Sequence, residues 1–323
     1  MVDKLVVTLP LPDAVMVMLR ERFDVSAWNE AEAIPETTLQ DWVQVSDAIL
    51  CSVGNPISAA TIARAAGRLK VISTISVGVD HIDTDAATAA GIPVGHTPGV
   101  LTDSTADMAL ALMLACTRRI AEADRFVRAG AWSGSWSAGT FLGKDLSRST
   151  VGLIGLGPIG QAVAKRVRGF GADVIAWNRT SKDVPGVSAV SLDDLFERSD
   201  IVSVHAAMTS DTRHLVSAQR LASMKDSAIL INTARGGLVD EQALINELDS
   251  GRLYAGLDVF EEEPLPKESP LMGLDNVVLA PHLGSATAAT RQAMMERALA
   301  NLEAGFSDEP IPFCVNPDVY KKL

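Results

Sequence analysis

Short apolar runs alternate with segments of helical length in the first hundred residues of the chain. The apolar runs lie at residues 3–9, 47–52, 70–76 and 92–97. Helix-length segments such as Pro12 to Phe23 and Ser58 to Ala66 lie between them. Because short apolar runs that alternate with helices are typical of βαβ units, this part of the chain predicts a parallel sheet.

A second series of the same kind begins at Val151. Its apolar runs lie at residues 151–155, 172–177, 200–205, 227–232, 254–259 and 276–280. Helices are predicted between several of these six runs, which is the pattern of a doubly wound α/β domain. The amphipathic stretch at residues 285–305 predicts a long helix that returns to the first domain.

The run at 151–155 leads directly into Gly155-Leu156-Gly157-Pro158-Ile159-Gly160 and then into a helical pattern. Gly155 permits a tight turn, Gly157 lets backbone approach a pyrophosphate, and Gly160 lets the helix pack closely on the strand. A lone match of this kind can be an ordinary glycine turn. The strand before it, the helix after it and the second strand together favour a dinucleotide site.

These patterns predict an α/β fold with two doubly wound parallel sheets. We expect a Rossmann cofactor domain at residues 99–284, inserted in a flavodoxin-like substrate domain formed by residues 1–98 and 285–323. The apolar stretch 102–119 starts with Asp and Ser/Thr capping candidates and predicts a helix that is buried on most sides, as between two domains. Trp132 and Trp136 follow in a glycine- and serine-rich loop. We expect these side chains to be buried against a partner subunit or over a cleft, with packing on the chain's own surface as the alternative.

Composition narrows the functional classes. The 323 residues are 47% hydrophobic and carry a net charge of −12, so nucleic acid and anionic membranes are unlikely partners. Cys51, Cys116 and Cys314 are scattered and form no metal-binding or disulfide pattern, so we expect no metal and a reducing cytoplasm. No signal peptide or membrane span is recognisable, and we expect a soluble protein.

Three polar motifs follow predicted strands, at residues 232–237, 257–264 and 281–285. The carboxyl ends of parallel strands form the ligand crevice of such folds. An Arg, a Glu and a His at that edge supply a fork for a carboxylate, an acid or base, and a group that orients it. Taken singly, Arg235 could be a structural ion pair and His282 a buried core histidine.

Six motifs occur together in the order and spacing of one family. They are SVGVDHID, LTDSTADMALALML, VGLIGLGPIG, INTARGGLVDE, AGLDVFEEEP and PHLGSAT. The chain resembles the D-isomer-specific 2-hydroxyacid dehydrogenases, and within them most the glyoxylate/hydroxypyruvate reductases. The resemblance covers nearly the whole chain and implies an NAD(P)-dependent enzyme that acts on small 2-oxoacids as a homodimer.

The resemblance also implies roles for individual residues. Arg235 would bind the carboxylate of the 2-oxoacid, helped by the N–H groups of Val77 and Gly78. His282 would protonate the ketone oxygen while hydride arrives from the nicotinamide. Glu263 would hydrogen-bond His282 and stabilise its charged form. The neighbouring carboxylates of the EEE run are expected to be solvated.

The expected cofactor contacts combine the glycine motif with positions that the resemblance suggests. Asp258 and Ala234 would lie near the nicotinamide carboxamide. The full expected set is Thr105, Gly155, Leu156, Gly157, Pro158, Ile159, Gly160, Asn178, Arg179, Thr180, His205, Ala206, Ala207, Thr212, Thr233, Ala234, Asp258, His282 and Gly284.

The choice between the two nicotinamide cofactors depends on the end of the second strand. NAD-selective sites place a carboxylate there, about 20 residues beyond the glycines. This chain has Trp177-Asn178-Arg179-Thr180 instead, so a guanidinium and a hydroxyl are available for a 2′-phosphate. We expect NADPH to be preferred, with equal use of NADH as the alternative if Arg179 and Lys182 are merely solvated.

The substrate pocket is less defined. Val53 and Gly54 lie in a plausible pocket loop and would suit a small 2-oxoacid. The resemblance also implies a tryptophan that a neighbouring subunit contributes, and Trp136 is the candidate. Other members of the family act on phosphoglycerate, phosphite or formate. The chain ends at Leu323, which argues against the regulatory domain that many phosphoglycerate dehydrogenases carry. The glutamate at position 263 argues against a formate dehydrogenase. A corepressor-type, nucleotide-dependent binding module is the alternative from a different class.

Overall fold

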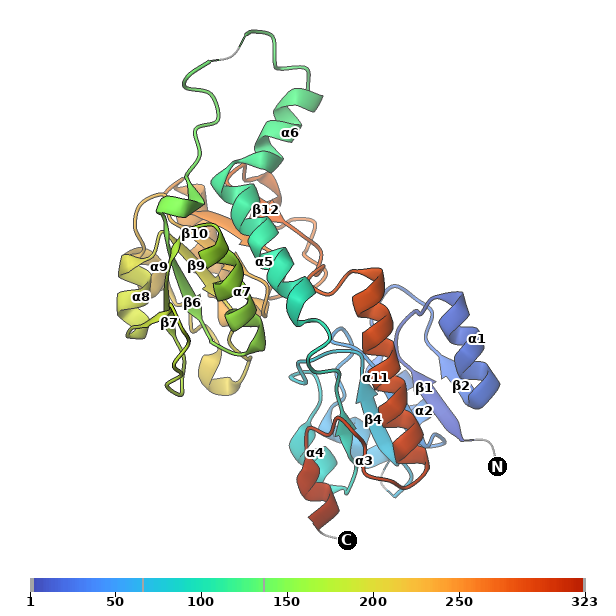
Figure 1. Ribbon diagram of the computed structural model, residues 1–323. Coiled ribbons are helices and arrows are strands. Elements are labelled where there is room, and N and C mark those ends of the chain that lie inside the picture. The colour runs from blue at the N-terminus through green and yellow to red at the C-terminus, as the bar shows by residue number, and fades with distance from the viewer. Residues whose placement is uncertain (1–2, 66, 136, 322–323) are drawn as a thin grey trace. The chain divides into compact units, whose positions relative to one another are not determined.

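The computed structural model describes residues 3–65, 67–135 and 137–321. The chain forms two compact units (Figure 1). The first consists of residues 1–100 and 288–323, and the second of residues 101–287.

The first unit contains a five-stranded parallel sheet with the order β2-β1-β3-β4-β5. Its strands are β1 Lys4–Val7, β2 Asp24–Ala27, β3 Ala48–Cys51, β4 Val71–Thr74 and β5 Val94–Gly95. This is the flavodoxin-like order, as predicted. Strand β2 was not predicted, because its DVSA sequence is short and lies half-exposed at the sheet edge.

Helices cover this sheet. They are α1 Asp13–Arg22, α2 Glu36–Val43, α3 Ala59–Arg64, α4 Thr84–Ala89, α11 Ala288–Phe306 and the 3-10 helix η5 Pro317–Lys321. The long helix α11 lies along β4, where Gly305 approaches Val71 so closely that a Cβ would lie 2.6 Å from the valine side chain. The predicted helix at residues 285–305 therefore exists, but it begins at Ala288.

The second unit contains a seven-stranded parallel sheet with the order β12-β11-β10-β9-β6-β7-β8. Its strands are β6 Thr150–Ile154, β7 Asp173–Trp177, β8 Ser188–Ala189, β9 Ile201–Val204, β10 Ile229–Asn232, β11 Tyr254–Leu257 and β12 Val277–Leu279. The crossover between β6 and β9 gives the Rossmann order, which confirms the predicted fold class. The two-residue strand β8 was missed because both its residues are exposed.

The helices of this unit are α5 Thr102–Thr117, α6 Ile120–Arg128, α7 Pro158–Gly169, α8 Leu192–Arg198, α9 Ala218–Ser223 and α10 Glu241–Asp249, with 3-10 helices η1 Leu146–Arg148, η2 Ser210–Thr212, η3 Gly236–Leu238 and η4 Pro270–Gly273. The predicted side-chain cap of α5 is wrong. Leu101 occupies the N-cap position, and the hydroxyls of Ser104 and Thr105 donate to the carbonyl of Gly284 instead. The helix packs against α7, β10 and β11.

Helix α6 and the loop after it extend away from the sheet (Figure 1). No residue of α6 is buried, and Trp132 in the loop is 66% exposed. The Phe126 and Phe141 rings, 5.1 Å apart, join the helix to the loop. Trp132 therefore does not pack on the surface of its own chain, and Trp136 lies outside the described residues. Among the helices described, none is both long and apolar enough to cross a membrane.

Candidate active site

The first and third glycines of the motif lie where a side chain would not fit. Gly155 has a φ of +99°, and a Cβ there would lie 2.8 Å from the backbone of His205. A Cβ on Gly160 would lie 2.1 Å from the carbonyl oxygen of Gly155. Around Gly157, which caps α7, a Cβ would meet nothing within 4 Å. The loop thus has open space at the N-terminus of α7, where backbone N–H groups favour a phosphate.

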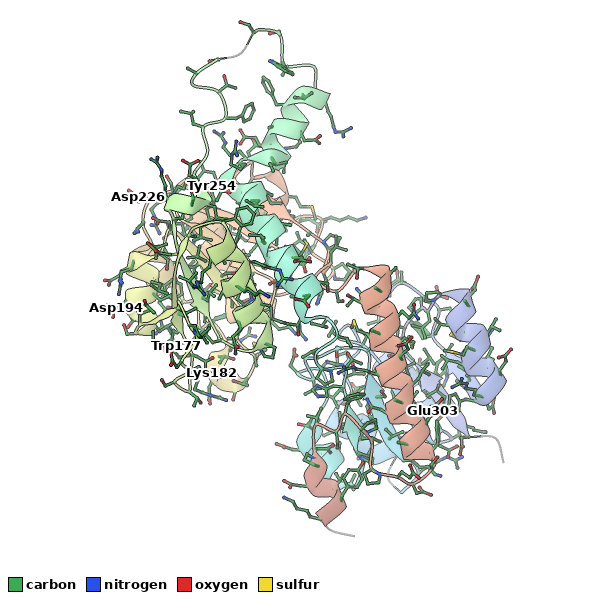
Figure 2. All side chains as sticks on the ribbon, in the orientation of Figure 1. Trp177, Lys182, Asp194, Asp226, Tyr254 and Glu303 are labelled. Carbon is green, nitrogen blue, oxygen red and sulfur yellow. The ribbon has the colours of Figure 1, made fainter. Side chains whose placement is uncertain are left out.

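Side chains from the next loop hold this turn in place. The Leu156 N–H donates to Asn178 Oδ1 at 2.9 Å, and its carbonyl accepts from Lys182 Nζ at 3.1 Å and Gln161 Nε2 at 2.8 Å. Lys182 and Trp177 are labelled at this end of the sheet in Figure 2. Asn178 and Lys182, considered from the sequence only as cofactor contacts or solvated side chains, therefore act on the glycine loop itself.

The end of β7 has no carboxylate within residues 177–180. Arg179 and Thr180 are exposed, and Arg179 makes no ion pair with any residue of the described chain. The Thr180 carbonyl accepts from Asn178 Nδ2 at 2.6 Å, so this turn is held by the same amide that holds the glycine loop. The guanidinium of Arg179 is therefore available to a ligand.

Residues 205–212 follow β9 at the same edge of the sheet. His205 donates its backbone N–H to the carbonyl of Ile154 and shares a 2.9 Å hydrogen bond between its Nε2 and Ser203 Oγ. Burial lowers the pKa of His205 to about 4, so its imidazole is neutral near pH 7. Thr212 Oγ1 donates to the carbonyl of Ala207 at 2.8 Å, which closes the turn that follows Ala206.

The loop after β10 presents Thr233, Ala234 and Arg235. The Asn232 side chain holds this loop in place, because it accepts a hydrogen bond from the Ala234 N–H at 3.0 Å and donates one to the Arg235 carbonyl at 2.8 Å. Thr233 Oγ1 is buried and has no hydrogen-bond partner among the described residues. Gly236 must be glycine, because a Cβ there would lie 1.8 Å from the backbone of Phe260. The buried, unpartnered hydroxyl of Thr233 suits the polar part of a bound cofactor.

Asp258 lies at the end of β11 and is 1% exposed. Its carboxylate accepts from the N–H groups of Leu283 at 2.6 Å and Gly284 at 2.8 Å. Burial raises the pKa of Asp258, although these hydrogen bonds oppose the shift. Because Thr105 Oγ1 donates to the Gly284 carbonyl, α5 and β11 together position the segment that contains His282.

His282 and Glu263 lie within hydrogen-bond distance of each other, as the resemblance implied. His282 Nδ1 lies 2.7 Å from Glu263 Oε2, and the two side chains are 31% and 32% exposed. The other oxygen of Glu263 accepts from the Phe260 N–H at 3.0 Å. Burial alone would raise the pKa of Glu263, but the hydrogen bond and charge of His282, together with the Phe260 N–H and the charge of Arg235, hold that pKa below its usual value. Glu263 is therefore ionised at neutral pH.

A second histidine–glutamate pair involves Glu261, which lies on the same loop as Glu263. His214 Nε2 is 2.5 Å from Glu261 Oε1, and the Glu261 N–H donates to Glu241 Oε2 at 3.0 Å. The expectation that Glu261 is merely solvated is therefore wrong. The sequence contains no signal for this pair, because 47 residues separate its members. His214 also donates its backbone N–H to the Gly237 carbonyl, so the pair ties the Arg235 loop to the Glu263 loop.

The remaining expected residues lie in the first unit. Val77 and Gly78 are half-buried in the loop after β4, while Val53 is half-buried and Gly54 exposed in the loop after β3. Because β3 and β4 are parallel neighbours, these loops share one edge of the five-stranded sheet. The described residues contain no group of three or more His, Cys, Asp or Glu side chains arranged to hold a metal.

Comparison with known proteins identifies the family. The family model "D-isomer specific 2-hydroxyacid dehydrogenase, NAD binding domain" matches residues 110–284. A glyoxylate reductase of Thermofilum pendens is 45% identical over 326 residues, which cover 98% of this chain and 96% of that protein. A solved structure of a protein from Thermus thermophilus is 44% identical with a TM-score of 0.90, covering 97% of this chain and 99% of that one.

A further solved structure is an NADPH-dependent glyoxylate/hydroxypyruvate reductase from Sinorhizobium meliloti, in complex with NADP and malonate. It is 32% identical, has a TM-score of 0.88, and the match covers 98% of each chain. The chain belongs to the D-isomer-specific 2-hydroxyacid dehydrogenases. It is an NAD(P)-dependent enzyme of that family.

Proposed function

We propose that this enzyme reduces small 2-oxoacids, glyoxylate and hydroxypyruvate first, and that it prefers NADPH. Where the product is chiral, it is the (R)-2-hydroxyacid. The observation that carries the proposal is the 2.7 Å pair of His282 and Glu263 at the same sheet edge as Arg235. The relatives that match nearly the full length of the chain bear the name glyoxylate reductase, which supports the choice of substrate.

His282 is the general acid in this proposal. An ionised Glu263 only accepts hydrogen bonds, so Nδ1 of His282 must carry a hydrogen, and Nε2 is left to give its proton to the ketone oxygen. After that transfer, the imidazole is neutral and still donates from Nδ1 to Glu263. The carboxylate thus keeps the ring in one orientation through both protonation states.

The other groups of the site bind and orient the substrate and the cofactor. Arg235 binds the substrate carboxylate as a planar fork, and the N–H groups of Val77 and Gly78 bind the same carboxylate. Bound NADPH supplies the hydride. The open space around Gly157 and the orphaned hydroxyl of Thr233 fit the pyrophosphate and a polar group of the cofactor. The imidazole of His205 is neutral near pH 7 and adds no charge to the cofactor site.

Preference for NADPH rests on the exposed Arg179 and on the missing carboxylate at residues 177–180. A guanidinium binds a 2′-phosphate strongly, and a carboxylate there would repel it. Arg179→Ala should therefore raise the KM for NADPH much more than the KM for NADH. Equal effects on the two cofactors would remove Arg179 from this role.

We also propose that the enzyme is a cytoplasmic homodimer. Its substrate domain consists of residues 1–98 and 285–323, and its cofactor domain of residues 99–284. The arm formed by α6 with residues 129–135 and 137–143 supports the dimer, because it exposes Ile120, Val127, Trp132 and Leu142 by 53% or more each. The three cysteines are free, which suits a reducing compartment.

The decisive experiment measures initial rates of cofactor oxidation with glyoxylate and with hydroxypyruvate, each with NADPH and with NADH. Fast turnover with NADPH on either acid is the expected result. Turnover that is equally fast with NADH would refute the preference but not the reaction. No turnover with any pair, despite cofactor binding, would refute the substrate assignment and leave another 2-oxoacid or a nucleotide-dependent binding module.

A further inference from the structure

Three consecutive carbonyl groups after β4 each accept a hydrogen bond. The Ser76 carbonyl accepts from the Thr97 N–H at 2.9 Å, the Val77 carbonyl lies 3.0 Å from His96 Nδ1, and the Gly78 carbonyl accepts from Ser76 Oγ at 2.7 Å. All of these groups belong to the first unit.

The carbonyl of one residue and the N–H of the next lie in one peptide plane and point in opposite directions. Holding the carbonyls of residues 76–78 therefore aims the N–H groups of Val77, Gly78 and Val79 away from the groups that hold them. Within the described part of the chain, none of these three N–H groups has an acceptor. Successive backbone N–H groups of a turn that have no acceptor in the protein can bind an anion.

His96 is the only side chain that holds the central peptide in the described structure. A carbonyl oxygen can only accept, so His96 Nδ1 must carry the hydrogen. The backbone of His96 is itself held on both sides: its N–H donates to the Phe313 carbonyl at 3.1 Å, and its carbonyl accepts from Asn301 Nδ2 at 3.1 Å. Asn301 is fully buried. The backbone that carries the imidazole is thus held in place by α11 and the segment that follows it.

The central peptide needs such a restraint because Gly78 lacks a Cβ. Rotation of the Val77–Gly78 peptide changes ψ of Val77 and φ of Gly78, and glycine tolerates a wide range of φ. Without a donor on the Val77 carbonyl, the Gly78 N–H is free to turn away from an anion. The Ser76 hydroxyl restrains only the next peptide.

We propose that His96 is a positioning residue for substrate binding, which holds the Val77–Gly78 peptide so that the Gly78 N–H faces the carboxylate of the 2-oxoacid. The inference rests on the proposed function, in which this N–H binds that carboxylate. His96 does not touch the substrate. Because the carboxylate is bound equally in the ground state and the transition state, His96 affects KM rather than kcat.

The test compares His96→Leu, His96→Asn and His96→Gln in the full-length enzyme with saturating NADPH. In asparagine, Nδ2 is as far from the backbone along the side chain as Nδ1 of histidine, so His96→Asn keeps a donor in place. Glutamine moves its amide one atom further out, and leucine has no donor. The measurements are kcat and KM for glyoxylate, KM for NADPH, and the melting temperature.

His96→Leu should raise the KM for glyoxylate about tenfold, because a hydrogen bond to a charged group is weakened, while kcat stays within about twofold. The KM for NADPH should not change, and His96→Asn should stay within about threefold of the wild-type KM. Wild-type KM in His96→Leu, or equal losses in all three variants, would overturn the inference.

If His96→Leu does not fold, the two amide variants decide, and equal KM values for them overturn the inference. Failure of the proposed function looks different, because the wild type itself would then show no turnover with glyoxylate or hydroxypyruvate.

Discussion

Replacement of Glu263 by glutamine tests the acid assignment most directly. Glutamine keeps the shape of the side chain, but it loses the negative charge and one of the two acceptor oxygens that now bind His282 Nδ1 and the Phe260 N–H. Two unit charges about 4 Å apart near a protein surface attract by about 4 kcal/mol. Since about a third of each side chain is exposed, we reduce this to about 1.5–3 kcal/mol, the range for hydrogen bonds to charged groups.

That loss should appear in the pH dependence of turnover. A change of about 1.4 kcal/mol corresponds to one pH unit, so the alkaline limb of the kcat profile should move to lower pH by about 1–2 units. Turnover of Glu263→Gln should fall about 10- to 100-fold at pH 8 and approach the wild-type value at pH 5. The assay is NADPH oxidation with saturating glyoxylate from pH 5 to pH 9.

The matched control is Glu262→Gln, the same chemical change on an exposed neighbour that forms no ion pair with any described side chain. It should leave the profile unchanged. A loss for Glu263→Gln that is uniform across the pH range would mean that the residue supports the loop without charging the acid. An unshifted profile at full activity would contradict the whole argument.

Three further predictions concern the cofactor loop and acid stability. Gly160→Ala places a Cβ 2.1 Å from the Gly155 carbonyl, so the dissociation constant of NADPH, measured by fluorescence titration, should rise more than about tenfold; unchanged binding would mean that the helix can shift. Asn178→Ala leaves the Leu156 N–H without its acceptor and should weaken NADPH binding about tenfold with kcat retained. A fall in kcat alone would argue against a role of Asn178 in holding the glycine loop. For Asp200, burial is outweighed by a backbone N–H and a lysine, which lower its pKa from 3.8, so its contribution to stability is complete above that pH and is lost as the pH falls. Asp200→Asn should therefore cost about 1 kcal/mol in urea denaturation at pH 6 and progressively less as the pH falls below 3.8, and a cost that does not depend on pH would contradict this reasoning.

The sequence by itself determined the two α/β sheets and the glycine loop. Fully buried parallel strands are mostly apolar runs, and the run at residues 228–231 can be recognised without knowledge of its neighbours. The role of Gly160 is also local, because it depends on the Gly155 carbonyl five residues earlier, whereas Gly155 combines a local positive φ with a close approach to the backbone of His205. The pairing of Glu263 with His282 followed from resemblance and not from the residues alone, since EEE presents three equivalent carboxylates.

Tertiary structure alone decided the contacts that join distant segments. Asn178 and Leu156 are 22 residues apart, His214 and Glu261 are 47 apart, and His96 meets Val77 across the sheet from β4 to β5. None of these polar side chains follows a period of 2 or 3.6, so the patterning of the chain contains no signal for its partner. The edge strands β2 and β8 were missed for a related reason: exposed strands need no apolar run, and only pairing with a neighbour defines them.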